Sequence, residues 1–206
     1  MRPNKHKGIF ILVEGLDGAG KTTALKKFLN GGNQTSVPFS YLKGAATKTF
    51  LHGLARRHPH TALFLTELVW TTFQPLRQAL RRGENVIMDK YFYFIASHVP
   101  DVNRPLNALL IKLAEPLMLQ PDLIIYFSVD LAERLARLKA GEANPHHETL
   151  VNDPSLADYR EKTYHYMVKH SGAKLVELDT TGLSVEQVVE RLNEVVHNFL
   201  HQHAHA

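Results

Sequence analysis

The sequence predicts one three-layer α/β domain, a five-stranded parallel sheet flanked by helices. Five short apolar runs lack helical spacing, and helical stretches separate them along the chain. This alternation favours a parallel sheet between two layers of helices. The 206 residues suit a single domain, from 1 to 206, with a sizeable core.

The first half of the chain contains three of these strands. The first covers 8–14, GIFILVE, and ends at Gly15. A helix follows in which Leu25, Phe28 and Leu29 share one face, and it stops at the Gly31-Gly32 pair. The remaining expected elements of this half are a strand at 37–43, helical stretches at 45–58 and 60–82 with Pro75 interrupting the second, and a buried strand at 85–89.

The second half repeats the alternation. It is expected to contain a helix at 101–119, a strand at 121–130, a short helix LAERLARLK, a helix at 154–170, a strand at 174–179 and a final helix. That last helix begins with Ser184 and Gln187 in the spacing of a capping box. Residues 141–155 lack periodicity and predict a lid-like loop, and the His-rich 200–206 predicts a disordered tail without function.

Composition excludes several classes of protein. The formal net charge is +4, and no run of Lys or Arg indicates a nucleic-acid surface. The absence of cysteine excludes disulfides and thiolate zinc sites. The apolar run Ile9–Val13 is too short for a membrane span or a signal-peptide core. We therefore expect a cytoplasmic protein with no nucleic-acid or membrane partner.

A phosphate-binding motif follows the first strand. The residues are Gly15, Leu16, Asp17, Gly18, Ala19, Gly20, Lys21, Thr22 and Thr23, which fit G-x-x-x-x-G-K-[ST]. The glycines let backbone N–H groups surround an anion, Lys21 reaches the β- and γ-phosphates, and the Thr22 hydroxyl can ligate Mg²⁺. Because the motif lies between a strand and a helix, we interpret it as a binding site for a nucleoside triphosphate.

Two acidic residues at strand ends are candidates for the second metal position. Asp89 closes the strand 85–89, where a carboxylate would help to hold Mg²⁺. Asp130 also ends a strand, but it precedes LAERLARL and fits a helix N-cap better. Lys90 follows Asp89 and is a poor base but a good phosphate partner, which favours transfer to a second phosphate-bearing molecule over hydrolysis. The chain lacks N-K-x-D after the motif, which disfavours a GTPase.

The chain resembles the thymidylate kinase family of P-loop nucleoside monophosphate kinases. The resemblance covers most of the chain, in GIFILVEGLDGAGKTT, GENVIMDKY, PDLIIYFSVDLAERLARL and KLVELDTTGLSVEQVVERL. It implies a P-loop NTPase fold with a five-stranded parallel sheet, and transfer of the ATP γ-phosphoryl group to dTMP with Mg²⁺. The family is often dimeric, so a homodimer is one option.

The resemblance also implies roles for single residues. Asp17 matches a carboxylate near the acceptor phosphate, and Asp89-Lys90-Tyr91 matches Asp-Arg-Tyr, whose Arg binds phosphate. Ala19 occupies the position of an Arg in one subclass, and the other subclass supplies its cations from the lid. Arg134 and Arg137, at the lid entrance, are the candidate transition-state cations here.

The acceptor side departs from the family pattern. DKYFYFIASHV lacks the family's Ser, Tyr and Gln, ALFLTELVW lacks its Arg, and no Lys or Arg lies between Lys139 and Arg160. The expected acceptor-binding residues are Lys43, Phe64, Trp70, Tyr91 and Phe94, although each aromatic also fits a core position. Three hypotheses stay open: a dTMP kinase, a kinase for another deoxynucleotide or nucleoside, and a nucleotide-binding protein without transferase activity.

Overall fold

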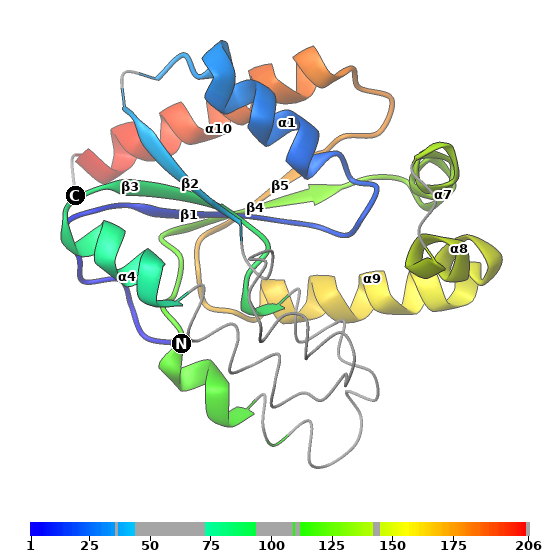
Figure 1. The fold of residues 1–206 in the computed structure, drawn as a ribbon, viewed down its shortest axis with the longest axis horizontal. Helices are drawn as coiled ribbons and strands as arrows, with labels where there is room; N and C mark the ends of the chain where they lie inside the picture. The colour runs from blue at the N-terminus through cyan, green and yellow to red at the C-terminus, as the bar shows by residue number, and fades with distance from the viewer. Residues whose placement is uncertain (36, 44–72, 94–108, 110–111, 142–144, 205–206) are drawn as a thin grey trace.

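The computed structural model describes residues 1–35, 37–43, 73–93, 109, 112–141 and 145–204 (Figure 1). Its centre is a sheet of five strands in the order β2-β3-β1-β4-β5, and every pairing is parallel. The strands are β1 (Phe10–Glu14), β2 (Phe39–Lys43), β3 (Asn85–Asp89), β4 (Leu123–Ser128) and β5 (Leu175–Asp179). The predicted five-stranded parallel sheet and its three-layer α/β fold are confirmed.

The register brings the ends of the inner strands together. β1 is buried along its whole length and lies between β3 and β4. Val13 pairs with Asp89, and Glu14 pairs with Tyr126. Because all strands run the same way, the residues that follow β1, β3 and β4 meet at one edge of the sheet, which is where ligands bind in open α/β folds.

One face of the sheet is covered by α1 (Lys21–Lys27) and α10 (Val185–Ala204), as Figure 1 shows. The segment η1 (Phe28–Gly32) follows α1, and its helical backbone is interrupted at Gly31, with φ +114°, where the stop was predicted. Ser184 and Gln187 cap α10: the Ser184 N–H donates to Gln187 Oε1 at 2.9 Å, and the Gln187 N–H donates to Ser184 Oγ at 3.3 Å. The predicted capping box is confirmed.

The predicted disordered tail is wrong for residues 200–204, because α10 continues to Ala204. Phe199 is buried and Leu200 packs against the same core, so the apolar face of the helix extends beyond the point where the histidines begin. Residues 205–206 lie outside the described part of the chain.

The opposite face is covered by α4 (Gln74–Arg81) and α9 (Pro154–Lys169) (Figure 1). Pro75 lies in the first turn of α4, where a missing N–H costs little. Residues 60–72 of the expected helix 60–82 and the whole stretch 45–58 lie outside the described residues. Of the expected helix 101–119, the structure describes helical residues at 109 and 112–114, followed by the 3₁₀ turn η3 (Glu115–Leu117).

The end of the lid region is helical, which corrects the predicted loop at 141–155. After α7 (Leu131–Ala140), a helix α8 (Pro145–Asn152) leads into α9. Leu150 is buried against Leu138 and Ala157, and this small cluster holds α8 in place. Local sequence contains little sign of this helix, because Leu150 and Val151 are the only large apolar residues in the stretch.

Two further features bear on function. Among the described residues, no helix is long and apolar enough to cross a membrane.

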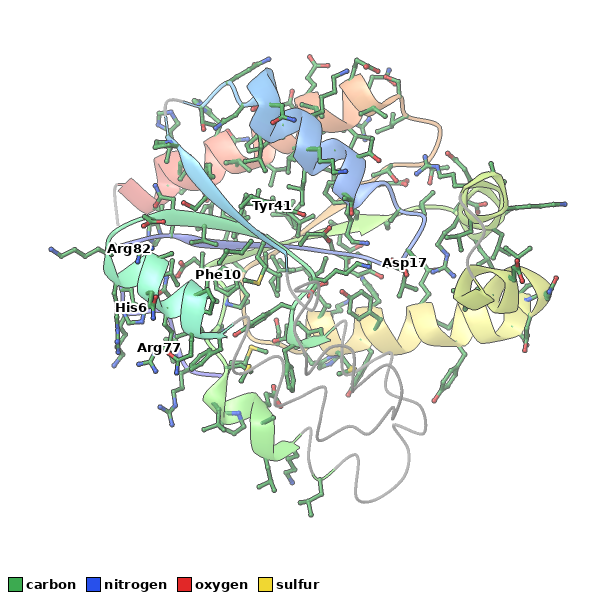
Figure 2. All side chains as sticks on the ribbon, viewed as in Figure 1. His6, Phe10, Asp17, Tyr41, Arg77 and Arg82 are labelled. Carbon is green, nitrogen blue, oxygen red and sulfur yellow. The ribbon has the colours of Figure 1, made fainter. Side chains whose placement is uncertain are left out.

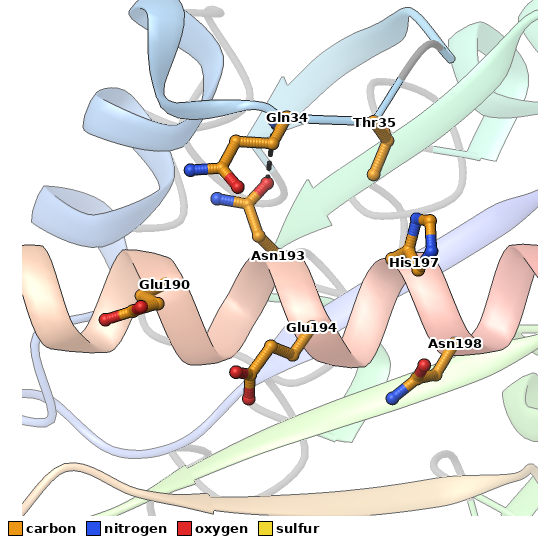
Figure 3. A pocket seen from close by; sticks show the side chains of 7 residues that line it. All are labelled: Gln34, Thr35, Glu190, Asn193, Glu194, His197 and Asn198. Carbon is orange, nitrogen blue, oxygen red and sulfur yellow. Dashed lines mark hydrogen bonds between the residues drawn. The ribbon is translucent and has the colours of Figure 1, made fainter.

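A polar cavity of about 520 Å³ lies between α10 and the segment that precedes β2, at the amino ends of the strands (Figure 3). Gln34 N–H donates to Asn193 Oδ1 there, at 2.9 Å. This cavity is remote from the phosphate-binding motif, which follows the carboxyl end of β1.

Candidate functional site

The loop between β1 and α1 depends on glycine for its shape. Gly15 has φ +134°, and a Cβ there would lie 2.4 Å from the carbonyl oxygen of Phe127. Gly18 has φ +90°, and its Cβ would lie 2.9 Å from Arg134 Cγ. A side chain at either position would push the loop away from the elements below it. The loop is therefore packed closely on β4 and α7, at the carboxyl edge of the sheet.

Lys21 closes the loop on itself. Its side chain is buried, and its ammonium donates a hydrogen bond of 2.8 Å to the Leu16 carbonyl oxygen. Burial lowers the pKa of this ammonium from its usual value, and Asp89, Asp17 and Glu14 oppose that change by their negative charge. The cation is thus held inside the loop, where a phosphate oxygen can replace the carbonyl oxygen as its partner.

Thr22 and Asp89 form the predicted metal pair. Thr22 Oγ1 donates to Asp89 Oδ2 at 2.8 Å. The other carboxylate oxygen, Oδ1, is buried and accepts no hydrogen bond from any residue that the structure describes. A hydroxyl and a carboxylate with a spare buried oxygen are suitable ligands for Mg²⁺, which keeps several waters and takes few protein ligands. No group of three or more acidic or histidine side chains in the described ranges could hold a metal by itself.

Lys90 and Asp17 meet beside the loop. Lys90 Nζ lies 2.9 Å from Asp17 Oδ1, and about one fifth of each side chain is exposed. Figure 2 shows Asp17 at the carboxyl edge of the sheet, facing the side of α8 and α9. Lys90 has φ +66°, which places a lysine in the left-handed region. Two of the residues predicted to bind the acceptor phosphate, Asp17 and Lys90, are therefore in direct contact.

Sequence reasoning missed a buried carboxylate below the loop. Glu14 is fully buried, and its Oε1 accepts a hydrogen bond of 3.1 Å from the Tyr91 N–H. Its Oε2 accepts from the Tyr164 hydroxyl, which in turn accepts a long hydrogen bond of 3.4 Å from the Gly15 N–H. Burial raises the pKa of Glu14 to about 7. A charged residue at the end of an apolar strand was the available signal for Glu14, whereas nothing local singles out Tyr164.

The two lid-entrance arginines have different surroundings. Arg134 is buried below the loop; its Nη2 donates to the Ala157 carbonyl oxygen at 3.1 Å and its Nη1 lies 3.5 Å from Glu161. Arg134 is one of the two candidate transition-state cations, and here its stem packs against Gly18 while its head contacts α9. Arg137 is part-exposed, and its guanidinium reaches the Gly18 carbonyl oxygen at 3.4 Å.

A second cavity, of about 220 Å³, lies next to the loop on the α10 side. Arg137 borders it, with Nη2 donating to the Thr180 carbonyl oxygen at 2.9 Å and to Glu133 at 2.5 Å. The lining residues are Ala19, Gly20, Thr23, Ala24, Arg137, Thr180, Leu183, Val185 and Val188. The cavity is thus apolar at its α10 wall, where Val185 and Val188 lie, and its polar side chains are those of Thr23, Arg137 and Thr180.

The predicted acceptor-binding residues are only partly placed. Lys43 ends β2 in register with Asp89, so its backbone reaches the same edge of the sheet. Phe64, Trp70 and Phe94 lie outside the described residues. Tyr91 is fully buried, packs edge-on against Phe10 with 5.5 Å between ring centroids, and accepts from the Leu119 N–H at 3.1 Å. The expectation that Tyr91 stacks on a base is therefore corrected: it is a core residue.

Comparison with known proteins agrees with this geometry. The family model "Thymidylate kinase" matches residues 13–192, which include the loop, both lid arginines and the first part of α10. The chain belongs to the thymidylate kinase family. This membership makes it an ATP-dependent nucleotide kinase.

Individual relatives support the thymidylate kinase assignment. A thymidylate kinase from Xanthomonas campestris pv. campestris is 30% identical over 154 residues, covering 70% of this chain and 67% of that protein. One from Leptospira borgpetersenii is 28% identical over 148 residues, covering 67% of this chain and 72% of that protein. The solved thymidylate kinase of Candida albicans shares the fold, with a TM-score of 0.71 over 95% of this chain and 93% of its own, at 18% identity.

Proposed function

We propose that this thymidylate kinase family member transfers the γ-phosphoryl group of ATP to dTMP and releases dTDP and ADP. The observation that carries the proposal is the placement of two pairs around the loop. Thr22 of the loop contacts Asp89, and Asp17 of the loop contacts Lys90, so each of two consecutive residues at the end of β3 is paired with one loop residue. Donor and acceptor phosphates would thus meet between a metal pair and a cation, as phosphoryl transfer requires.

The donor side consists of the loop residues 15–23. Their backbone amides surround the triphosphate, and the Lys21 ammonium exchanges the Leu16 carbonyl oxygen for a phosphate oxygen. Thr22 and Asp89 would hold Mg²⁺, which when bound neutralises charge on the β- and γ-phosphates. The 220 Å³ cavity beside Arg137 and Thr180 adjoins the loop and would take the base and sugar of ATP, so we assign Arg137 to the donor nucleotide as a second cation beside Lys21.

The acceptor side consists of Asp17, Lys90 and Lys43. The Lys90 ammonium, held by Asp17 in this structure, would bind the dTMP phosphate and screen its repulsion from the γ-phosphate. Lys43 joins them at the end of β2, in register with Asp89. Lysine in place of the family's Arg provides a single point charge where a fork of donors is usual, so we expect a weaker hold on the acceptor phosphate.

A panel of acceptors tests the proposal. The full chain is incubated with ATP and Mg²⁺ and, in turn, dTMP, dUMP, dCMP, dGMP and thymidine, and nucleotide products are separated chromatographically. We expect dTDP from dTMP, with the highest kcat/KM of the panel. If another acceptor is phosphorylated and dTMP is not, dTMP is not the substrate and that acceptor takes its place. Thermal stabilisation by ATP without product from any acceptor would identify a nucleotide-binding protein without transferase activity.

A further inference from the structure

Lys90 is held in a backbone conformation that lysine rarely adopts. Its φ is +66°, and it is the one non-glycine residue with positive φ among those the structure describes. The left-handed region is unfavourable for a residue with a Cβ, so surrounding contacts must maintain it. Strain of this kind is a signal of function when the strained residue lies at a ligand site.

The backbone on both sides of Lys90 is fixed. Asp89, before it, is the last residue of β3 and pairs with Val13. Tyr91, after it, is fully buried, and its N–H donates to Glu14 Oε1 at 3.1 Å. The Lys90 N–H itself donates a longer bond, of 3.4 Å, to the Val13 carbonyl oxygen. The Glu14 carboxylate is therefore the closer of these two polar restraints on the turn that contains Lys90.

Glu14 is itself held from the opposite side. Its Oε2 accepts from the Tyr164 hydroxyl, and Tyr164 is a fully buried residue of α9. One carboxylate oxygen is thus hydrogen-bonded to the turn after β3, and the other to a helix that packs below the sheet. A carboxylate fixed at both oxygens cannot follow the turn if Lys90 relaxes.

We infer that Glu14 is a positioning residue for phosphoryl transfer: by holding the Tyr91 amide it keeps Lys90 in the left-handed conformation that presents its ammonium to Asp17 and to the acceptor phosphate. The inference rests on the proposed function and adds a residue that never touches substrate. It predicts that Glu14 acts through Lys90, so that the two residues are coupled in catalysis.

A double-mutant cycle measures that coupling. Glu14→Met keeps side-chain length but cannot accept from the Tyr91 N–H, and Glu14→Gln keeps an acceptor oxygen. Each is made in the wild-type and in the Lys90→Ala background, and kcat/KM for dTMP is measured beside the Kd for ATP. With Lys90 present, we expect Glu14→Met to lower kcat/KM about 10²-fold and Glu14→Gln to lower it only a few-fold, with ATP affinity retained. In the Lys90→Ala background, the Glu14→Met penalty should disappear.

Three outcomes overturn the inference: Glu14→Met as active as the wild type, a penalty that persists in the Lys90→Ala background, or Glu14→Gln as impaired as Glu14→Met. If Glu14→Met does not fold, as judged by circular dichroism and a thermal melt, Glu14→Asp replaces it. That variant keeps the charge and withdraws the oxygen from the Tyr91 amide, and we expect the same loss and the same disappearance when it is combined with Lys90→Ala. Failure of the proposed function is distinguishable, because the wild type itself would then form no dTDP.

Discussion

Thr22 Oγ1 donates a hydrogen bond of 2.8 Å to Asp89 Oδ2, and this bond joins the first turn of α1 to the last residue of β3. The two residues are 67 positions apart in the chain, and the parallel register of β1 and β3 brings them to one edge of the sheet. The spare Asp89 oxygen is buried beside them. The proposed function places Mg²⁺ at this pair.

Asp89→Asn tests that pair. Asparagine keeps the shape but loses the charge, so we expect kcat at fixed Mg²⁺ to fall about 10²-fold and to recover in part as Mg²⁺ is raised. Mg²⁺ titrations of the kinase rate provide the measurement. Asp130→Asn is the matched control, because Asp130 follows the neighbouring strand but only caps α7, by accepting from the Ala132 N–H at 2.8 Å. Equal losses in the two variants would contradict the metal assignment.

The Lys90→Gly variant should be more stable than the Lys90→Ala variant, although alanine is usually the less destabilising of these two residues. Both lack the ammonium, but φ +66° penalises alanine and not glycine. We expect Lys90→Gly to exceed Lys90→Ala by ~1 kcal/mol in free energy of unfolding, measured by urea denaturation. If Lys90→Ala proves the more stable of the two, the left-handed turn is not present in solution.

Tyr164→Phe should destabilise the protein without a change in packing volume. It leaves Glu14 Oε2 and the Gly15 N–H without their buried partner, at a cost of ~1–3 kcal/mol in free energy of unfolding. Tyr166→Phe, on the same helix, is the control, because its side chain is 62% exposed and should change stability by less than ~0.5 kcal/mol. The comparison is made by urea denaturation, and equal effects would argue against a buried hydroxyl at Tyr164.

The buried Glu14 carboxyl predicts a pH dependence of stability. Burial raises its pKa from 4.5 to about 7, with the Tyr164 hydroxyl and the charges of Lys21 and Asp89 facing it. Between these pH values the folded state keeps the proton that the unfolded chain has lost, so this group makes stability fall as pH rises. We expect Glu14→Gln to remove roughly 1–3 kcal/mol of that decline between pH 4.5 and 7. Parallel stability–pH curves for wild type and variant would contradict the shift.

Much of the fold could be predicted from local signals. The apolar runs located all five strands, and the Ser184–Gln187 box and the Asp130 cap marked two helix starts. The phosphate loop was recognisable because its glycines, lysine and threonine are adjacent in sequence. The helix at 145–152 was missed because three residues from separate elements, Leu138, Leu150 and Ala157, hold it by burial.

The rest of the site depends on long-range packing. Arg134 and Arg137 are three positions apart on one helix and looked equivalent, yet the turn of α7 sends one below the loop and the other to its rim. Tyr91 looked suitable for stacking on a base, but its hydroxyl reaches the Leu119 amide in the core. The Glu14–Tyr164 bond joins residues 150 positions apart, and no local pattern could indicate it.

In the proposed reaction, the loop after β1 binds the triphosphate whose γ-phosphoryl group is transferred. The most direct test of this role is the dTMP-dependent rate and the ATP affinity of Lys21→Ala, beside Lys26→Ala on the exposed face of the same helix. We predict a loss of about 10²-fold or more in kcat/KM for Lys21→Ala and wild-type behaviour for Lys26→Ala. A Lys21→Ala protein that binds ATP and forms dTDP as well as the wild type would rule out this role for the loop.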